Sequence, residues 1–432
     1  MSMTIQSNVL ISIANPFVRC VAVSFFQNIF EQIRPRRLYK NRLETFFLQN
    51  NFSWGDYGSI YLLGLGKAAT LESRQFMDFV KERFGIVLDD YLIITKHGYA
   101  GQEKGNHVFE SSHPYLDEKS FEAAKVARNF LSKTDEKSLI FILVSGGTSA
   151  LIEDFPSAER EQLVKKFNEL VNSGISIDEL NHLRKVFSNV KNMRLIKDCP
   201  GKVVSLLTSD IPSNDAYLIG SSPSLLEEIP QRKRETLIKK YGMENFSEAE
   251  SVPFERKDDQ FEVLISFHNL IPICSSLLDG QIRFRQKAYN DQLNDVWRDY
   301  LADLDVEQIN LSFGEINVEV KGSGLGGRNT HFVLFIADKV FGDNCLNLTG
   351  DQLNSLVIFS VGTDGSDGPT DASGAWITFE KFNSVPHFKF LENFDSYNYF
   401  SKLGTLVKSG PTGTNLMDVR GVGPKHLINC QT

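Results

Sequence analysis

The segment Ser59-Ile60-Tyr61-Leu62-Leu63-Gly64-Leu65-Gly66-Lys67-Ala68-Ala69 joins a short apolar run to a glycine-bearing turn, and a helical pattern then continues to Phe84. This order predicts a β-strand, a tight turn and a helix. Backbone N–H groups at such a helix start can hold an anion, and Lys67 adds a positive charge beside them. The segment lacks the longer glycine spacing and the hydroxyl of a P-loop. By itself the segment is equally consistent with an anion-binding turn and with a plain turn that carries a solvated lysine.

Three further apolar runs repeat this pattern along the first half of the chain. They cover residues 90–95, 139–144 and 202–208, and each ends in polar or glycine-bearing sequence. Apolar strands separated by helices predict a parallel sheet with helices on both faces. Ligands of such sheets bind at the carboxyl ends of the strands. We therefore expect an α/β fold whose N-terminal domain is Rossmann-like with a mainly parallel sheet.

The rest of the chain predicts a smaller, mixed α/β C-terminal domain. The 432 residues exceed the roughly 250 to 300 that one hydrophobic core usually serves. A charge-dense stretch at 227–259 is typical of a solvated domain connection, and helical spacing follows from Asn269 to Leu304 and from Asn329 to Val340. We predict domains at 1–245 and 306–432, joined by a helical region at 246–305.

Composition excludes several classes of function. The net charge of -8 argues against non-specific binding to nucleic acid or to an anionic membrane. Five scattered cysteines without metal-ligand spacing indicate a reducing compartment. The apolar-rich N-terminus is interrupted by polar residues, so we expect an amphipathic helix from about Phe17 to Ile33 rather than a signal peptide or membrane anchor. The protein is expected to be cytoplasmic, and the sequence leaves a homo-oligomer open.

Two strand ends carry candidate binding groups. Ser145-Gly146-Gly147-Thr148-Ser149 follows the third apolar run, and its glycines and hydroxyls predict a phosphate or carboxylate site, with a plain flexible turn as the alternative. Asp210 follows the fourth run. It is a candidate general base or metal contact, and a turn cap before proline is about as consistent with the local sequence.

Two segments in the last third of the chain carry further candidates. The glycine-rich loop 321–329 ends on Arg328 and Asn329. The Arg328 guanidinium can donate two parallel hydrogen bonds to a carboxylate or phosphate, and Asn329 can cap the following helix or add a further contact. The run 361–372, Val-Gly-Thr-Asp-Gly-Ser-Asp-Gly-Pro-Thr-Asp-Ala, gathers three carboxylates after a strand-like segment. Carboxylates this close favour a cation, a phosphate-bound metal or a hydroxyl-rich substrate, although part of the run is also good turn and helix-cap sequence.

These segments, taken in order with His113-Pro114 and Gly410-Pro411-Thr412-Gly413-Thr414-Asn415, resemble the class II glycerate 2-kinases, also called the MOFRL family. The resemblance extends from about Phe17 to Val422. It implies a Rossmann-like N-terminal domain, a smaller C-terminal domain and an active site in the cleft between them. The implied reaction is phosphorylation of the 2-hydroxyl of D-glycerate by ATP with Mg²⁺, and the family's catalytic lysine and arginine fall on Lys67 and Arg328.

The candidate residues suit phosphoryl transfer, which needs positioning and charge neutralisation more than covalent chemistry. We assign Lys67 and Arg328 to transition-state charge, Asp210 to the base, and Asp364 or Asp367 to the metal. The substrate- or phosphate-binding candidates are Gly66, Ser145, Gly146, Gly147, Thr148, Ser149, Asn329, Thr363 and Asn415.

The chain also departs from the family pattern. Thr148 stands where a glycine is usual, Thr330-His331 replaces Gln-Glu, Ser221-Ser222-Pro223 replaces Ser-Gly-Pro, and the segment 184–193 has lost a histidine and its glycines. Two alternatives therefore stay open: a kinase for a related small hydroxyacid, and a catalytically weakened homologue that binds nucleotide or sugar acid. The retained residues Lys67, Asp210 and Arg328, with the acidic run, favour the kinase. A weakened homologue would have little reason to keep charged residues that are costly to bring together.

Overall fold

The structure is a computed structural model, and it describes residues 22–101, 105, 107–173, 175–211, 213–252, 259–285, 289, 291–414 and 416–428. The chain forms two compact units. The N-terminal unit is Pro35–Ser266, and the C-terminal unit joins the segment up to Arg34 to the residues from Phe267 onward. The domain boundaries placed at 245 and 305 from the sequence stay a prediction. Within the described ranges, no helix has the length and hydropathy needed to cross a membrane.

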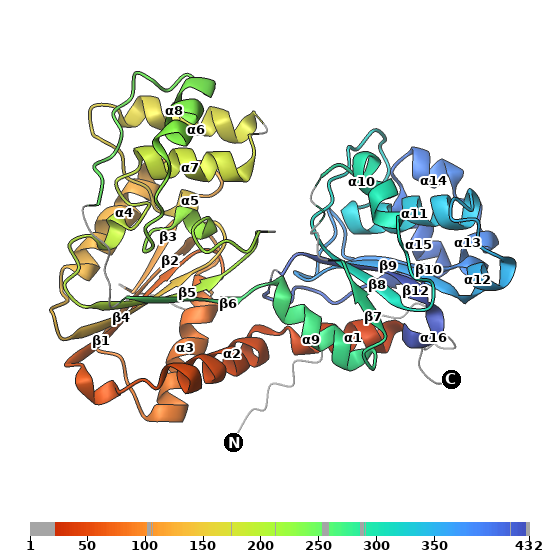
Figure 1. The fold of residues 1–432 in the computed structure, drawn as a ribbon, viewed down its shortest axis with the longest axis horizontal. Coiled ribbons are helices and arrows are strands. Elements are labelled where there is room, and N and C mark those ends of the chain that lie inside the picture. The colour runs from red at the N-terminus through yellow and green to blue at the C-terminus, as the bar shows by residue number, and fades with distance from the viewer. Residues whose placement is uncertain are drawn as a thin grey trace. The chain divides into compact units, whose positions relative to one another are not determined.

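The N-terminal unit is built on a six-stranded sheet, and all of its neighbouring strands are parallel (Figure 1). The order is β3-β2-β1-β4-β5-β6, so the direction of strand addition reverses between β1 and β4. This confirms the predicted Rossmann-like parallel sheet. The strands are β1 (Ser59–Leu65), β2 (Asp90–Lys96), β3 (Val108–Ser111), β4 (Ser138–Val144), β5 (Lys202–Thr208) and β6 (Gln260–Ile265).

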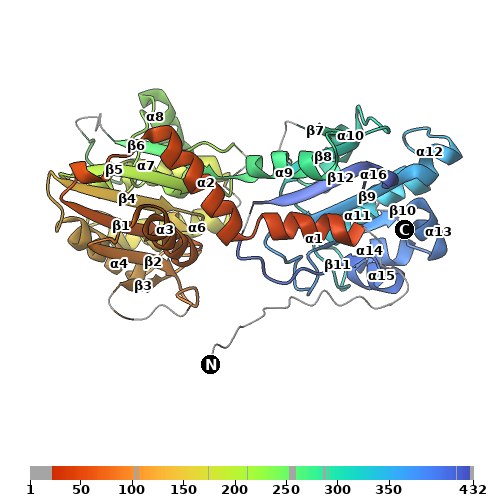
Figure 2. The ribbon, with the colours of Figure 1, turned by 90° about the horizontal axis from the view of Figure 1, so that it is seen from below.

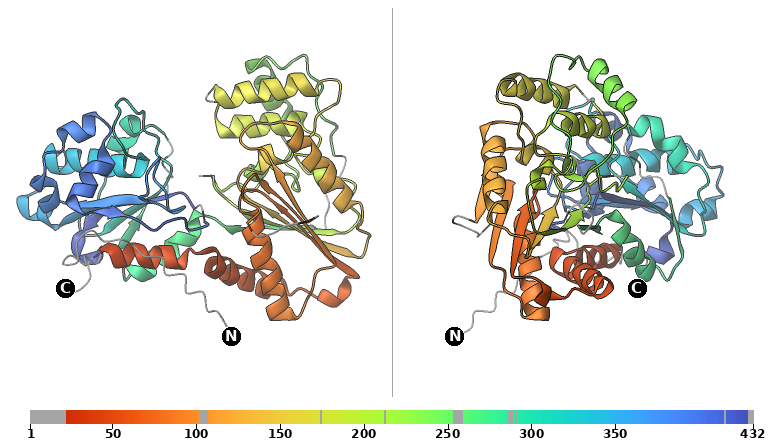
Figure 3. Two further views of the ribbon diagram at one scale, coloured as in Figure 1. Left: turned by 180° about the vertical axis from the view of Figure 1, so that it is seen from behind. Right: turned by 60° about the vertical axis from the view of Figure 1, so that its left-hand side comes forward.

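Helices cover both faces of this sheet, as its apolar strands require (Figure 3). On one face α2 (Pro35–Asn50) and α3 (Ala69–Phe84) pack through aromatic rings, and Phe76 lies 4.6 Å from Phe141 of β4 between ring centroids. On the other face α4 (Glu118–Leu131) packs in one apolar cluster with Ile140 and Ile142. Beyond it lie α5 (Thr148–Leu151), α6 (Arg160–Asn172), α7 (Ile177–Phe187) and α8 (Gln231–Lys240).

The C-terminal unit holds a mixed six-stranded sheet in the order β11-β10-β9-β12-β8-β7. Only β7 and β8 run parallel. The strands are β7 (Ile282–Phe284), β8 (Ile309–Gly314), β9 (Leu356–Gly362), β10 (Gly374–Thr378), β11 (Leu406–Val407) and β12 (Asp418–Pro424). This confirms the mixed α/β architecture expected for the second half of the chain.

One face of this sheet is covered by α1 (Ala22–Gln32), which packs beside α9 (Leu270–Leu277) (Figures 1 and 2). Phe25 and Phe26 of α1 both pack edge-on against Phe359 of β9. The opposite face carries α11 (Arg328–Ala337), which continues as a π-helical turn, Asp338–Gly342. The remaining helices are α10 (Leu293–Leu301), α12 (Gly350–Ser355), α13 (Phe379–Ser384), α14 (Phe388–Glu392), α15 (Ser396–Leu403) and α16 (Lys425–Ile428).

Two expectations for local structure need correction or restriction. The helical spacing over 269–304 is interrupted, because the left-handed Gly280 ends the turn after α9 and the three-residue strand β7 follows it. A strand of three residues is too short to show a period of its own. The predicted N-terminal helix agrees with α1, and its first part, residues 17–21, lies outside the described residues.

Candidate active site

The turns after β1 and β4 form one joined structure. The Lys67 N–H donates to the Gly146 carbonyl at 2.9 Å, and the Ser145 N–H donates to the Leu65 carbonyl at 2.8 Å. Gly66 has φ +126°, and a Cβ there would lie 2.6 Å from the Ser145 carbonyl oxygen, so this position requires glycine. The strand order reverses at this point, which is where open α/β sheets bind ligands.

Three chemically active side chains line the Gly146–Gly147 turn. A Cβ on Gly147 would lie 3.0 Å from Lys67 Cε and 3.1 Å from His113 Cδ2. A Cβ on Gly146 would lie 2.0 Å from Asp210 Oδ2. The two glycines therefore leave the space that these side chains fill, and the structure brings Lys67 and Asp210 to one turn, although the sequence separates them widely.

The charges around this turn favour an anion. Burial raises the pKa of the Asp210 carboxyl, and the nearby positive charge of Lys67 opposes that rise. Burial, together with the nearby charges of Lys67, Lys96 and Arg184, lowers the pKa of His113 to about 4. His113 is therefore neutral at pH 7 in a cationic environment. A carboxyl with a raised pKa is better suited to accept a proton near neutral pH than an ordinary aspartate.

The predicted hydroxyl donors of this loop already have partners within the protein. Ser145 Oγ donates to the Leu65 carbonyl at 3.3 Å, and Thr148 Oγ1 donates to the Ser145 carbonyl at 2.7 Å. Ser149 Oγ lies 2.8 Å from Ser221 Oγ. These hydroxyls hold the shape of the loop, so their assignment to direct phosphate binding stays a prediction.

Backbone donors remain beside Lys67. The N–H groups of Gly146 and Gly147 donate to no acceptor in the part of the chain that the structure describes. Both stand at the start of the short helix α5, where N–H groups have no partner within the helix. Together with the Lys67 ammonium, they are the groups of this turn best placed to donate to a phosphate or carboxylate.

Several positions in the segments that depart from the family pattern have a left-handed backbone conformation. Ser222 has φ +58°, and Asn192 and Met193 have φ +53° and +69°. A left-handed conformation costs a non-glycine residue about 1–2 kcal/mol. At Ser222 the cost is partly offset, because its Oγ donates to the Leu225 carbonyl at 2.7 Å. These three residues therefore carry local strain that a glycine at the same positions would avoid.

In the C-terminal unit, Arg328 makes a bidentate ion pair with Asp418. Nε and Nη2 of Arg328, the first residue of α11, donate to Asp418 at 2.7 and 2.9 Å, and Nη2 also lies 3.1 Å from Glu315. The Asp418 side chain is only 1% exposed. Burial lowers the pKa of Arg328, but hydrogen bonds and charge from Asp418, with the charges of Glu315 and Asp364, raise it well above its ordinary value overall.

Sequence reasoning missed both carboxylate partners of Arg328. Asp418 begins β12 and lies opposite Gly362 of β9, so pairing across the sheet brings it to α11. Nothing in the local sequence of Asp418 indicates this, although its place at the start of a strand could have marked it as a candidate. Asn329 also donates from Nδ2 to Asp418 at 3.1 Å, and its side chain therefore serves the same carboxylate.

The acidic run 361–372 divides into separate functions. Asp367 is buried, and its two carboxylate oxygens accept hydrogen bonds from the N–H groups of Asn329 and Thr330 at 2.8 and 2.9 Å, which caps α11. Burial raises the pKa of Asp367, and these two hydrogen bonds oppose that rise. Asp364 accepts from the N–H and the hydroxyl of Ser366, both at 2.9 Å. Asp371 pairs with Lys408 at 2.8 Å.

A magnesium site built entirely from protein side chains is not present among the described residues, since no three His, Cys, Asp or Glu side chains there could hold a metal ion together. Mg²⁺ in kinases is usually bound by one or two carboxylates together with substrate phosphates, and such a site needs no protein cage. Asp364 suits a site of this kind better than Asp367, whose carboxylate caps α11. Both assignments stay predictions.

Two other predicted residues in this unit are placed as follows. Thr363 is buried. Its Oγ1 donates to the Met417 carbonyl and accepts from the Leu416 N–H, both at 2.7 Å. It therefore ties the end of β9 to the segment before β12. Asn415 lies outside the described residues.

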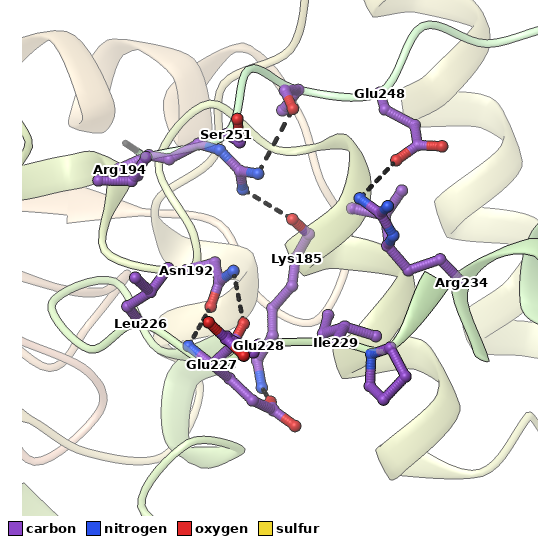
Figure 4. Close-up of a pocket in the computed structure, with 14 residues that line it drawn as sticks. Lys185, Asn192, Arg194, Leu226, Glu227, Glu228, Ile229, Arg234, Glu248 and Ser251 are labelled. Carbon is purple, nitrogen blue, oxygen red and sulfur yellow. Dashed lines mark hydrogen bonds and ion pairs between the residues drawn. The ribbon is translucent and has the colours of Figure 1, made fainter. Parts of the chain in front are cut away.

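A pocket of about 540 Å³ lies elsewhere in the N-terminal unit, between α7, α8 and the segments that flank them (Figure 4). Its polar side chains bind one another: Lys185 pairs with Glu227, and Arg234 pairs with Glu248 at 3.2 Å. Arg194 donates to the Lys185 carbonyl at 2.7 Å. None of the candidate site residues lines this pocket. The strand-end turns, rather than this hollow, define the candidate active site.

The sheet order and the polar site at its reversal point define an α/β protein of the Rossmann type with an added mixed α/β unit. The family profile described as "Domain of unknown function (DUF4147)" matches residues 21–252, and that of the MOFRL family matches residues 308–418. The chain belongs to this DUF4147/MOFRL glycerate kinase family, and the resemblance predicted from its motifs is confirmed.

Named relatives span nearly the whole chain. It is 27% identical to a D-glycerate 2-kinase of Thermotoga maritima, over 92% of this chain and 96% of that protein. It is 29% identical to a glycerate 2-kinase of Pyrococcus horikoshii, over 84% of this chain and 86% of the relative. The crystal structure of a glycerate kinase from Thermotoga maritima has the same fold, with a TM-score of 0.71 and 24% identity over 93% of this chain and 98% of that one.

Proposed function

We propose that this protein transfers the γ-phosphoryl group of ATP to the 2-hydroxyl of D-glycerate and so forms 2-phosphoglycerate. The observation that carries the proposal is the meeting of Lys67, Asp210 and the Gly146–Gly147 turn where the parallel sheet reverses its strand order. Relatives named glycerate 2-kinase support the choice of substrate.

The groups at this turn suit an attack by a hydroxyl on a phosphoryl group. We assign Asp210 to accept the proton of the substrate hydroxyl, because its carboxylate lies against Gly146 and its pKa is raised. Lys67 and the N–H groups of Gly146 and Gly147 would bind the negative oxygens of the substrate or the transferred group.

Arg328 is assigned to charge on the transferred phosphoryl group. Its Nε and Nη2 donate to Asp418, and Nη2 also lies 3.1 Å from Glu315, whereas Nη1 donates no hydrogen bond within the described residues. The carboxylates fix the guanidinium plane and leave Nη1 as a donor for an oxyanion. Mg²⁺ bound with the nucleotide would neutralise phosphate charge, and Asp364 is the candidate carboxylate for it.

The test is direct assay of the purified protein. ADP is measured after incubation with ATP, Mg²⁺ and D-glycerate, and the phosphorylated carbon is identified by phosphorus–proton coupling in NMR spectra. We expect ADP and 2-phosphoglycerate in equal amounts. Glycolate, lactate and L-glycerate test the alternative of a related hydroxyacid. ATP binding without turnover on any of these acids would refute the kinase and favour a weakened binding homologue.

A further inference from the structure

Lys191 is a buried lysine whose ammonium binds backbone carbonyls beside the candidate site. Its Nζ donates to the Ile152 carbonyl at 2.6 Å and to the Thr148 carbonyl at 3.2 Å. Thr148 is the first residue of α5 and follows Gly147 directly, and Ile152 ends this helix. The proposed mechanism gives Lys191 no function, although its ammonium reaches the peptide group next to the Gly146–Gly147 turn.

The short helix α5 depends on contacts of this kind. It has only four residues, and a single helical turn is not stable by itself. Carbonyls at the end of a helix lack partners within it, and a positive charge placed there is favourable. Hydrogen bonds continue from this end to the turn, because the Ala150 and Leu151 N–H groups donate to the Gly147 carbonyl at 3.1 and 3.2 Å. Lys191 therefore holds one end of a hydrogen-bonded unit whose other end is the glycine turn of the candidate site.

The charges that face Lys191 make its ammonium sensitive to pH. Burial lowers the pKa of Lys191 well below that of an ordinary lysine, the buried carboxylate of Glu153 opposes this fall, and Arg184 of α7 adds to it. Arg194, in the segment that follows, donates to the Lys191 carbonyl at 3.2 Å. We therefore expect Lys191 to lose its proton at a lower pH than a lysine in water does.

We propose that Lys191 is a positioning residue of the candidate site, whose ammonium keeps the Gly146–Gly147 turn in the shape that binds an oxyanion. The ammonium holds the Thr148 carbonyl, and this peptide group directly follows the turn. Without it, the end of α5 would lose its charge-assisted donor, and the N–H groups at the turn would lose their fixed direction. The inference rests on the proposed function for its two probes, D-glycerate and Mg²⁺-ADP, which offer the turn a carboxylate and a phosphate.

The experiment measures affinity per folded molecule, which a merely structural residue would not change. D-Glycerate and Mg²⁺-ADP are titrated calorimetrically, each alone, into the wild-type protein and Lys191→Met at pH 6 and pH 9. The number of sites reports how much protein is folded, and the dissociation constant reports the shape of the turn. At pH 6 we expect at least one ligand to bind Lys191→Met about 5- to 30-fold more weakly, which corresponds to about 1–2 kcal/mol, the upper part of the range for charges at helix ends.

The pH dependence tests whether the charge of Lys191 is responsible. The contribution of the ammonium is complete below the Lys191 pKa and is lost above it, so the ratio of the two dissociation constants should fall toward one at pH 9. Asp210 and Lys67 are present in both proteins, and their titration therefore cancels in this ratio.

Two control variants separate the position of Lys191 from the general effect of removing a buried charge. Lys191→Met leaves Glu153 without one of its two neighbouring cations, so Lys191→Met combined with Glu153→Gln removes both charges and should show the same loss of affinity. Lys185→Met removes another buried lysine, which pairs with Glu227 and lines the separate pocket. This variant should keep both affinities within about twofold of wild type.

Each outcome has a defined meaning. Weaker binding by both Lys191 variants at pH 6, with a smaller difference at pH 9, supports the proposal. Unchanged dissociation constants with fewer sites, a ratio that is the same at both pH values, or failure of both variants to fold would overturn it, because Lys191 would then serve only the fold. Binding that depends on Lys191 without turnover in the wild type would refute the kinase and leave this proposal standing. A wild-type protein that binds neither ligand would overturn both.

Discussion

The buried carboxyl group of Glu72 should make the stability of the N-terminal unit depend on pH. Glu72 lies in the first turn of α3, is 6% exposed, and accepts a hydrogen bond from Thr208 Oγ1 at 2.7 Å. Burial raises its pKa from 4.5 to about 7, although the Thr208 hydrogen bond opposes the rise. Removing this charge by Glu72→Gln keeps an acceptor for Thr208 and leaves nothing to titrate.

The size of the effect follows from the two pKa values. The folded state binds the proton more tightly than the unfolded state, so this contribution to stability is complete below pH 4.5 and is lost as pH rises to about 7. The full loss is about 3 kcal/mol, because each pKa unit corresponds to about 1.4 kcal/mol. Glu72→Gln should therefore match the wild type near pH 4.5 and exceed it by up to about 3 kcal/mol at pH 8.

Thermal unfolding followed at several pH values is the assay. A domain of this size shifts by about 2–4 °C per kcal/mol, so we expect a Tm gain of roughly 6–12 °C at pH 8 that vanishes toward pH 4.5. Glu227→Gln is the control of opposite sign. Burial raises the Glu227 pKa, but hydrogen bonds and charges from His182 and Lys185 outweigh it and hold the pKa at about 2, so this variant should lose stability at neutral pH. A Tm difference between Glu72→Gln and wild type that stays constant from pH 4.5 to 8 would refute the reasoning.

Three further predictions concern the candidate site. Asp210→Asn should lower kcat by about 10²- to 10⁴-fold while the Tm stays within a few degrees of wild type, and a steady-state assay that finds normal kcat would remove Asp210 as the base. Arg328→Ala should lower kcat, and it should lower the free energy of unfolding in urea by about 2–3 kcal/mol because it leaves the buried Asp418 carboxylate without its main partner. Arg328→Lys should recover part of the stability. Unchanged stability of the alanine variant would contradict the ion pair. Gly66→Ala should destabilise the N-terminal unit by at least about 1–2 kcal/mol, since its Cβ would meet the Ser145 carbonyl and φ is +126°, and wild-type stability on chemical unfolding would show that the turn adapts.

The strand ends of the N-terminal unit could be predicted from the sequence because each apolar run ends in its own polar turn. Both the Lys67 turn and the Gly146–Gly147 turn carry local signals of this kind. Their joining depends on the pairing of β1 with β4, which is a long-range choice that no local pattern records. Sequence reasoning therefore gave the parts of the site, and the sheet order supplied their arrangement.

The acidic run shows where local reasoning fails. Three aspartates close in sequence suggest a shared cation, yet Asp367 and Asp371 turn to partners far along the chain. Asp367 caps α11 by accepting from the N–H of Asn329, 38 residues earlier, and its burial cannot be deduced from the run. The same holds for Arg328 and Asp418, whose pairing over 90 residues arises from the antiparallel sheet.

The chain leaves the C-terminal unit after Arg34 and returns to it at Phe267, and this has consequences during synthesis. Phe25 and Phe26 of α1 are made early, but Phe359, against which they pack, follows more than 300 residues later. At about 5–20 residues per second, α1 must wait on the order of 20–70 s for its packing surface. The Pro35–Ser266 unit can fold on the ribosome first, as an insertion within a unit that closes only when β9 and β12 emerge. A fragment that starts at Phe267 would lack α1, so a self-contained form of this unit needs residues 22–34 attached to it, for example by circular permutation.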